Sequence, residues 1–210
     1  MKHPEVKVKD IGDYIHWVAK TYGNHDDVLF CGQPARFDLK PKIGRPEFVL
    51  RGAKKMPEVE RRMLDRFRSH AAFMLDKVPA TNMEWLALAQ HHGMATRLLD
   101  WSTNPLVALW FAVERPAQNQ ESAAVWAFTA EEPDLIDLTD DPFTIKRTMA
   151  FRPSPSTRRI AAQSGWFTVH WWNESARRFV AFETIRRIRE RLTKLTIPAS
   201  SFADIRSHLG

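Results

Sequence analysis

Apolar residues recur at helical spacing in several segments of the chain. The first segment covers residues 11–22 and is ended by Gly23 and Asn24. A second segment begins at Pro57 and carries an apolar stripe between charged residues, which predicts an amphipathic helix with the stripe in the core. The stripe consists of Val59, Met63, Phe67, Ala71 and Met74. Three further helices are predicted: residues 83–92 behind Thr81 or Asn82, residues 105–114 behind Asn104, and residues 202–209 behind Ser200 or Ser201.

Strands are predicted where short apolar runs meet glycine, proline or other turn residues. The run VLFCGQ, residues 28–33, indicates a buried strand, and WFTVHWW, residues 166–172, is apolar on both sides and therefore predicts a central strand. Further extended segments are predicted over residues 95–102, 123–130, 134–140 and 190–198. Residues 34–48 and 142–159 contain several prolines and are predicted to be loops. This mixture of elements indicates an α+β fold.

The composition narrows the class of protein. A chain of 210 residues with 44% hydrophobic residues is expected to form a single globular domain over residues 1–210. Cys31 is the only cysteine, which excludes an intramolecular disulfide and a cysteine-rich metal site. No stretch has the character of a signal peptide or of a membrane span, so we expect a cytoplasmic protein that does not enter membranes.

The chain has a formal net charge of +6, and much of the excess lies near the C-terminus. Glu174, Glu183 and Glu190 interrupt this basic region. It is either a solvated surface or a binding face for a polyanion such as nucleic acid. The basic residues concerned are Arg177, Arg178, Arg186, Arg187, Arg189, Arg191 and Lys194.

The greatest density of polar residues lies in the segment Gln90–Pro105, and we expect the functional pocket there. His91 and His92 are adjacent, so they cannot share one face of a helix, and we expect no metal site at this pair. Each histidine either stabilises the negative end of a helix or contacts a ligand. The polar residues are Gln90, His91, His92, Thr96, Arg97, Asp100, Trp101, Ser102 and Asn104.

Arg97 and Asp100 lie on opposite faces of the predicted strand, because side chains alternate along an extended chain. The two charges therefore do not pair, and each needs another partner, such as a second carboxylate, a phosphate or a sugar. Ser102, Thr103 and Asn104 occupy the cap position of the following helix. They either cap that helix or leave its first backbone N–H groups free to bind a phosphate.

Three motifs resemble the FRG domain, a module of bacterial and phage proteins. They are VLFCGQ with LKPKIGR, then AQHHGMATRLLDWSTNPLVALWFA, then RRIAAQSGWFTVH, and the resemblance covers roughly residues 10–200. The family is named for a Phe-Arg-Gly at its first strand, where this chain has Phe30, Cys31 and Gly32. The resemblance implies a setting in toxins, phage defence or stress response.

The same arrangement is similar to the ADP-ribosyltransferases, whose split sheet binds NAD. The likeness implies an α+β domain in which helices flank a mixed central sheet, with a split sheet as one option. Cys31 would take the place of the arginine, Ser102 that of the hydroxyl, and Gln163 or Glu174 the third motif. Because cysteine lacks the charge of arginine, either the protein is a weakened relative or Arg36, Arg45 or Arg97 makes the contact. Cys31 itself is either a nucleophile activated by a histidine or an inert buried side chain.

Three functions are compatible with these residues. The first is an ADP-ribosyltransferase-like enzyme that acts on NAD or a related nucleotide, and that either transfers ADP-ribose to a protein target or cleaves the glycosidic bond, with an antitoxin as a further partner. The second is a module that binds nucleic acid or protein through the basic C-terminal region and Trp166, Phe167, Trp171 and Trp172. The third is a metal-independent nuclease that uses His91 or His92. For the first function the expected catalytic residues are Ser102, Gln163, Glu174 and His92, and the expected NAD-binding residues are Cys31, Gly32, Gln33, Arg45, Gln90, His91, Arg97, Asp100, Trp101, Asn104 and Arg159.

Overall fold

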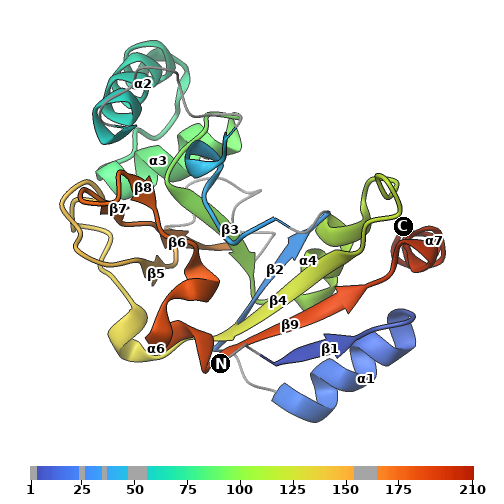
Figure 1. Ribbon diagram of the computed structural model, residues 1–210. Coiled ribbons are helices and arrows are strands. Elements are labelled where there is room, and N and C mark those ends of the chain that lie inside the picture. The colour runs from blue at the N-terminus through green and yellow to red at the C-terminus, as the bar shows by residue number, and fades with distance from the viewer. Residues whose placement is uncertain (1–3, 24–26, 35–36, 47–55, 154–164) are drawn as a thin grey trace. The chain divides into compact units, whose positions relative to one another are not determined.

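The computed structural model describes residues 4–23, 27–34, 37–46, 56–153 and 165–210. The chain folds into two compact units. Unit 1 comprises the described parts of residues 1–38, 101–132 and 182–210, and unit 2 those of residues 39–100 and 133–181. The elements of both units are labelled in Figure 1.

The fold is α+β with a mixed sheet, as predicted. Seven of the described strands follow the hydrogen-bonded order β1-β9-β4-β2-β3-β6-β5. Strand β1 is parallel to β9, whereas the pairs β4–β9, β2–β4, β2–β3 and β5–β6 are antiparallel. The strands are β1 (Glu5–Lys7), β2 (Val28–Gln33), β3 (Leu98–Ser102), β4 (Ala123–Thr129), β5 (Met149–Phe151), β6 (Gly165–Val169) and β9 (Leu192–Ile197).

In unit 1 one face of the strands packs against helices α1 (Ile11–Tyr22), α4 (Pro105–Val113) and α7 (Phe202–Leu209). Val28 and Phe30 point into this core from β2. A Cβ atom on Gly32 would lie 1.8 Å from the carbonyl oxygen of Ala108, so glycine allows α4 to approach β2 closely. The hydroxyl of Tyr14 donates a hydrogen bond of 2.8 Å to the carbonyl of Pro105, which ties α1 to the start of α4. The short helix α6 (Arg186–Arg189) also belongs to this unit.

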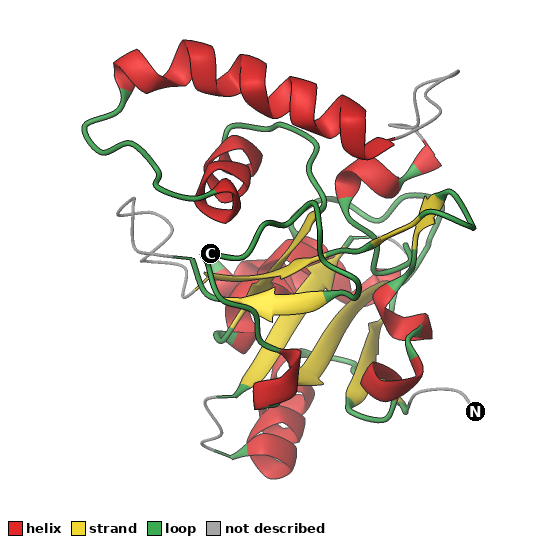
Figure 2. Ribbon diagram, turned by 90° about the vertical axis from the view of Figure 1, so that its left-hand side faces the viewer, coloured by secondary structure: helices red, strands yellow, loops and turns green. Residues whose placement is uncertain are grey.

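In unit 2 the helices α2 (Met56–Ala71) and α3 (Asn82–His91) lie side by side (Figures 1 and 2). Thr81 and Glu84 form a capping box at the start of α3, in which each side chain binds the backbone N–H of the other residue. The apolar side of α3 packs with Leu98, Phe151 and Phe167. A two-stranded sheet of β7 (Trp172–Asn173) and β8 (Arg178–Phe179) completes the unit.

Most predicted elements are confirmed, including α1, α3, α4, α7, β2, β4 and β9. The strand predicted over residues 134–140 is wrong, because this segment forms only the isolated bridge of Leu135 with Ala150. The loop predicted over residues 142–159 contains β5. Short elements such as β1, β8 and α6 were not predicted, since two to four residues carry too little periodicity.

The apolar stripe predicted for the second helix is also partly wrong. The fully buried residues of α2 are Met56, Glu60 and Leu64, whereas Met74, beyond its end, is 85% exposed. The helix is therefore rotated relative to the prediction and brings a glutamate into the core. Among the described residues, no helix combines the length and the apolar character that crossing a membrane requires.

Candidate functional site

Several of the polar residues predicted from the sequence meet in unit 2, around the carboxylate of Asp100. The Nε2 of Gln90 donates a hydrogen bond of 2.8 Å to the Oδ2 of Asp100. The hydroxyl of Thr96 donates to the Oε1 of Gln90 and accepts a 3.1 Å hydrogen bond from the backbone N–H of Leu98. The amide of Gln90 is thus held at both ends, and its orientation is fixed.

This arrangement follows from the end of α3. The helix stops at His91, and Gly93 adopts a φ of 91°, which glycine tolerates without strain. The N–H of Gly93 bonds to the carbonyl of Gln90 at 2.9 Å, and that of Met94 bonds to Ala89 at 3.0 Å. The chain therefore turns back at once, and the segment leading into β3 passes beside the last turn of the helix.

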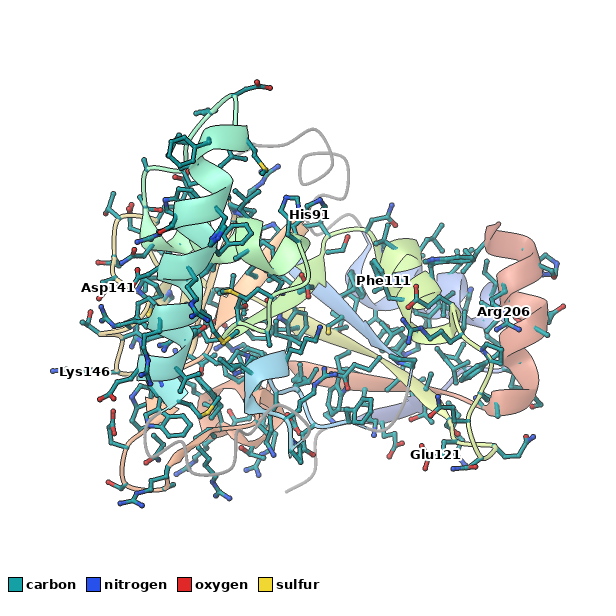
Figure 3. The ribbon with its side chains drawn as sticks, turned by 90° about the horizontal axis from the view of Figure 1, so that it is seen from above. His91, Phe111, Glu121, Asp141, Lys146 and Arg206 are labelled. Carbon is teal, nitrogen blue, oxygen red and sulfur yellow. The ribbon has the colours of Figure 1, made fainter. Side chains whose placement is uncertain are left out.

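Two basic side chains contribute to the electrostatics of Asp100. Asp100 is exposed to solvent, yet the surrounding protein desolvates its carboxyl group and raises its pKa. The hydrogen bond from Gln90 and the charges of Arg45 and His91 oppose this rise. His91 lies at the end of α3 (Figure 3). We call Arg45, Gln90, His91, Thr96 and Asp100 the Asp100 cluster; it combines an accessible acid with two basic groups.

Arg97 is not part of this cluster, because its side chain is buried in unit 2. Its Nε donates a 2.7 Å hydrogen bond to the Oε2 of Glu60, and its backbone N–H donates another of 2.7 Å to Oε1. Its Nη1 donates to the carbonyl of Pro142 at 2.7 Å, and its guanidinium lies 4.4 Å from the centre of the Phe143 ring. The expectation that Arg97 pairs with a carboxylate other than Asp100 is confirmed. In this conformation the side chain of Arg97 stabilises the core of unit 2. The NAD-binding prediction required this side chain to contact a ligand instead.

The last residues of the predicted segment lie in unit 1 and have local structural roles. The ring of Trp101 packs against Phe128 and Phe182, with centroids 6.0 and 5.5 Å away. The buried hydroxyl of Ser102 accepts a 3.0 Å hydrogen bond from the N–H of Asn104. The Oδ1 of Asn104 accepts one of 2.9 Å from the N–H of Leu106. The capping interpretation of Asn104 is confirmed, and Ser102 stabilises the same turn.

The first motif forms β2, where Cys31 and Gln33 point to the face opposite that of Val28 and Phe30. Cys31 is buried and lies opposite Trp126 of the neighbouring strand β4. This surrounding agrees with the inert interpretation of the thiol. Gly32 keeps β2 close to α4, and Gln33 is buried with both polar atoms of its amide unbonded.

Apart from His92, whose ring lies 5.4 Å from that of His91, the remaining predicted residues that the structure describes do not join the Asp100 cluster. Arg36, Arg159 and Gln163 lie outside the described residues. Glu174 is exposed in the turn between β7 and β8. His92 is exposed, and its ring lies 6.0 Å from that of Phe67.

The structure weakens one part of the nucleic-acid hypothesis. Phe167 and Trp172, two of its four aromatic residues, are buried in the cores of unit 2 and cannot stack on bases. In the basic region, Arg191 forms an ion pair of 3.3 Å with Glu131.

Residue Glu60 was missed from the sequence, although it is central to unit 2. On α2 it lies four residues from both Met56 and Leu64, so it shares their face. That spacing was the available signal, but a lone glutamate among arginines on a helix is usually solvated. Its partner Arg97 is 37 residues away, which no local pattern reveals.

Part of the chain matches a known protein family. Residues 26–121 match the model of the FRG domain. The predicted resemblance to the FRG domain is confirmed over these residues. All residues of the Asp100 cluster and the Glu60–Arg97 pair lie within the matched range. Searches of the curated proteins and of the solved structures found no match, and the likeness to the ADP-ribosyltransferases stays a prediction.

Proposed function

We propose that this FRG domain binds NAD or a related nucleotide at the Asp100 cluster and cleaves the bond between the nicotinamide and the ribose. The observation that carries the proposal is the carboxylate of Asp100, which is accessible to solvent while Gln90 fixes its orientation. An enzyme that cleaves a glycosidic bond needs a positioned carboxylate, because positive charge develops on the sugar ring. The ADP-ribose is passed to an acceptor or to water.

Each residue of the Asp100 cluster has a role in this proposal. The bond breaks with its electron pair on the nicotinamide, and the ribose carbon gains an oxygen from water or from an acceptor hydroxyl. The charge of Asp100 stabilises the developing cation, and its raised pKa suits it to receive the proton that the incoming oxygen loses. Arg45 and His91 supply positive charge for the diphosphate. Gln90 acts as a positioning residue.

This assignment changes two expectations from the sequence. Asp100 becomes the catalytic carboxylate instead of Gln163 or Glu174, because it is the acid within the cluster. Arg45 takes over the anion contact that the motif arginine would make, since the side chain at position 31 is a buried cysteine. Members with such an activity would act as toxins, phage-defence factors or stress effectors, with a protein target and an antitoxin as partners.

The test is incubation of the full chain with NAD, followed by chromatographic measurement of free nicotinamide and by transfer of label to added protein. We expect Asp100→Asn to lower the rate by about 100-fold or more. Arg45→Ala should raise KM more than it lowers kcat, because it removes a binding contact. The matched control is Asp76→Asn, since Asp76 is an exposed aspartate of the same unit outside the cluster.

Two results would overturn the proposal. One is a wild-type protein that neither releases nicotinamide nor transfers label, and that binds no NAD in calorimetry. The other is an Asp100→Asn variant that is as active as Asp76→Asn. Circular dichroism of both variants verifies that they are folded, so that a loss of rate reports on the carboxylate.

A further inference from the structure

Gln33, the last residue of β2, buries an amide group that forms no hydrogen bond with any described residue. The residue is only 3% exposed, and both Nε2 and Oε1 are inaccessible to solvent and unpaired. Nearly all buried polar groups in proteins are hydrogen-bonded, and an unpaired one destabilises the folded state. A leucine or methionine would fill the same space without this cost. The amide therefore destabilises the protein without ligand. A bound ligand that pairs with the amide would remove this effect.

The neighbours of Gln33 across the sheet explain why it has no partner. Gln33 lies opposite Ala124 on β4, whose methyl group cannot form a hydrogen bond. Ala124 in turn lies opposite Thr196 on β9, and the hydroxyl of Thr196 already donates a 2.6 Å hydrogen bond to Glu5. The next residue along the chain, Pro34, is exposed, so Gln33 marks the point where the buried part of β2 ends.

A flat aromatic side chain lies on the same face of unit 1. Trp126 pairs with Cys31 and is therefore the diagonal neighbour of Gln33, at a spacing of about 7–8 Å. The Nζ of Lys194 lies 5.3 Å from the centre of the Trp126 ring and covers one of its faces. A planar ligand would pack against the other face of the ring while the amide of Gln33 binds its edge. The amide has two donors and one acceptor, so the matching edge presents an acceptor next to a donor.

We propose that Gln33 is the recognition residue of a small-molecule site in unit 1, and that the ligand is a planar group with an adjacent donor and acceptor. A carboxamide and an amino-substituted nucleobase both have this chemistry. The site is inferred from unit 1 alone. It requires no reaction at Asp100, so it stands or falls independently of the proposed function.

The first arm of the test measures thermal unfolding of the full chain without ligand. We expect Gln33→Leu to raise Tm by about 2–4 °C, because the unpaired amide is removed. Gln118→Leu is the matched control, since Gln118 is an exposed glutamine of the same unit. Gln33→Met, which is close to glutamine in shape, replaces Gln33→Leu if the branched side chain prevents folding.

The second arm uses matched pairs of probes at millimolar concentration, with binding followed by calorimetry. Nicotinamide is compared with nicotinate, which lacks the donor, and adenosine with purine riboside, which lacks the amino group. We expect wild type to bind one member of one pair at least 10-fold more tightly than its match, and the apolar variant to lose that preference. The pair that discriminates distinguishes a carboxamide from a nucleobase.

The proposal is overturned if the apolar variant has a lower Tm than wild type, since the amide then has a partner within the chain. It is equally overturned if neither pair discriminates in wild type, or if the preference survives in the variant. Nicotinamide release by wild type bears on Asp100 and leaves each of these outcomes unchanged.

Discussion

The side chains of Gln90 and Asp100 are joined by a hydrogen bond of 2.8 Å, although Gln90 lies at the end of a helix and Asp100 lies within a strand. This bond lowers the pKa of Asp100, which desolvation raises. Replacing Gln90 with leucine removes the donor, so the carboxyl group should keep its proton to a higher pH. Carbon-13 NMR of the Asp100 carboxyl group measures this change. If the domain cleaves NAD, the acidic limb of its pH profile should move to higher pH with it.

Gln118→Leu provides the comparison, because Gln118 is an exposed glutamine remote in sequence from the Asp100 cluster. An Asp100 that titrates identically in wild type and in Gln90→Leu would show that the hydrogen bond does not govern the acid. The role of Gln90 as a positioning residue would then be lost.

The ion pair of Glu60 and Arg97 predicts a large effect on stability. Glu60→Ala leaves the guanidinium of Arg97 buried without its carboxylate, and we expect the free energy of unfolding to fall by about 3–5 kcal/mol. Urea denaturation measures the loss. Glu58→Ala, an exposed position on the same helix, should change it by less than about 0.5 kcal/mol.

A double replacement separates the pair from its individual charges. Glu60→Leu combined with Arg97→Met removes both charges at once and should recover much of the stability that Glu60→Ala loses. Equal losses in the double and the single variant would mean that packing, instead of an unpaired charge, explains the effect.

His170 predicts how the stability of the protein depends on pH. Burial and the nearby charge of Arg97 lower the pKa of His170 from 6.5 to about 3, against a hydrogen bond with the backbone of Val180. Below about pH 6.5, His170 therefore binds a proton in the unfolded chain but not in the folded chain. The free energy of unfolding falls as the pH drops below 6.5. At pH 5 the loss amounts to about 2 kcal/mol, from 1.36 kcal/mol for each pH unit.

Denaturation series at pH 7 and pH 5 give this difference for wild type. His170→Asn should remove most of it, whereas His16→Asn, an exposed position on α1, should leave it as in wild type. An imidazole signal of His170 that titrates near pH 6.5 in NMR would contradict the explanation directly.

Local patterns in the sequence were sufficient for the elements that have clear ends. Gly23 and Thr81 mark helix boundaries by their own chemistry, and the structure has helices that end and begin there. The alternation over residues 134–140 was misleading, because a strand needs a partner along its whole length and Leu135 finds only one bridge. Pairing is a property of the tertiary fold and is absent from a short window of sequence.

The candidate site shows the same division. Gln90, Thr96 and Asp100 could be predicted as a group because they are close in sequence and because Gly93 turns the chain back. The partner of Arg97 could not be identified in this way, although the need for one followed from the burial of a charge. The amide of Gln33 is unpaired because the residue opposite it, Ala124, has no polar side chain. The sequence does not reveal this neighbour, because the register of the strands must be known first.

The approach of α4 to β2 at Gly32 affects how mutational surveys of this domain are to be interpreted. A methyl group there would overlap the backbone of Ala108, so every other amino acid forces the helix away from the strand. Such a survey will score position 32 as intolerant, as it would a residue that contacts the substrate. At position 32 this intolerance reflects the close spacing of α4 and β2. Only variants that keep α4 in place can show whether a residue takes part in ligand binding or catalysis.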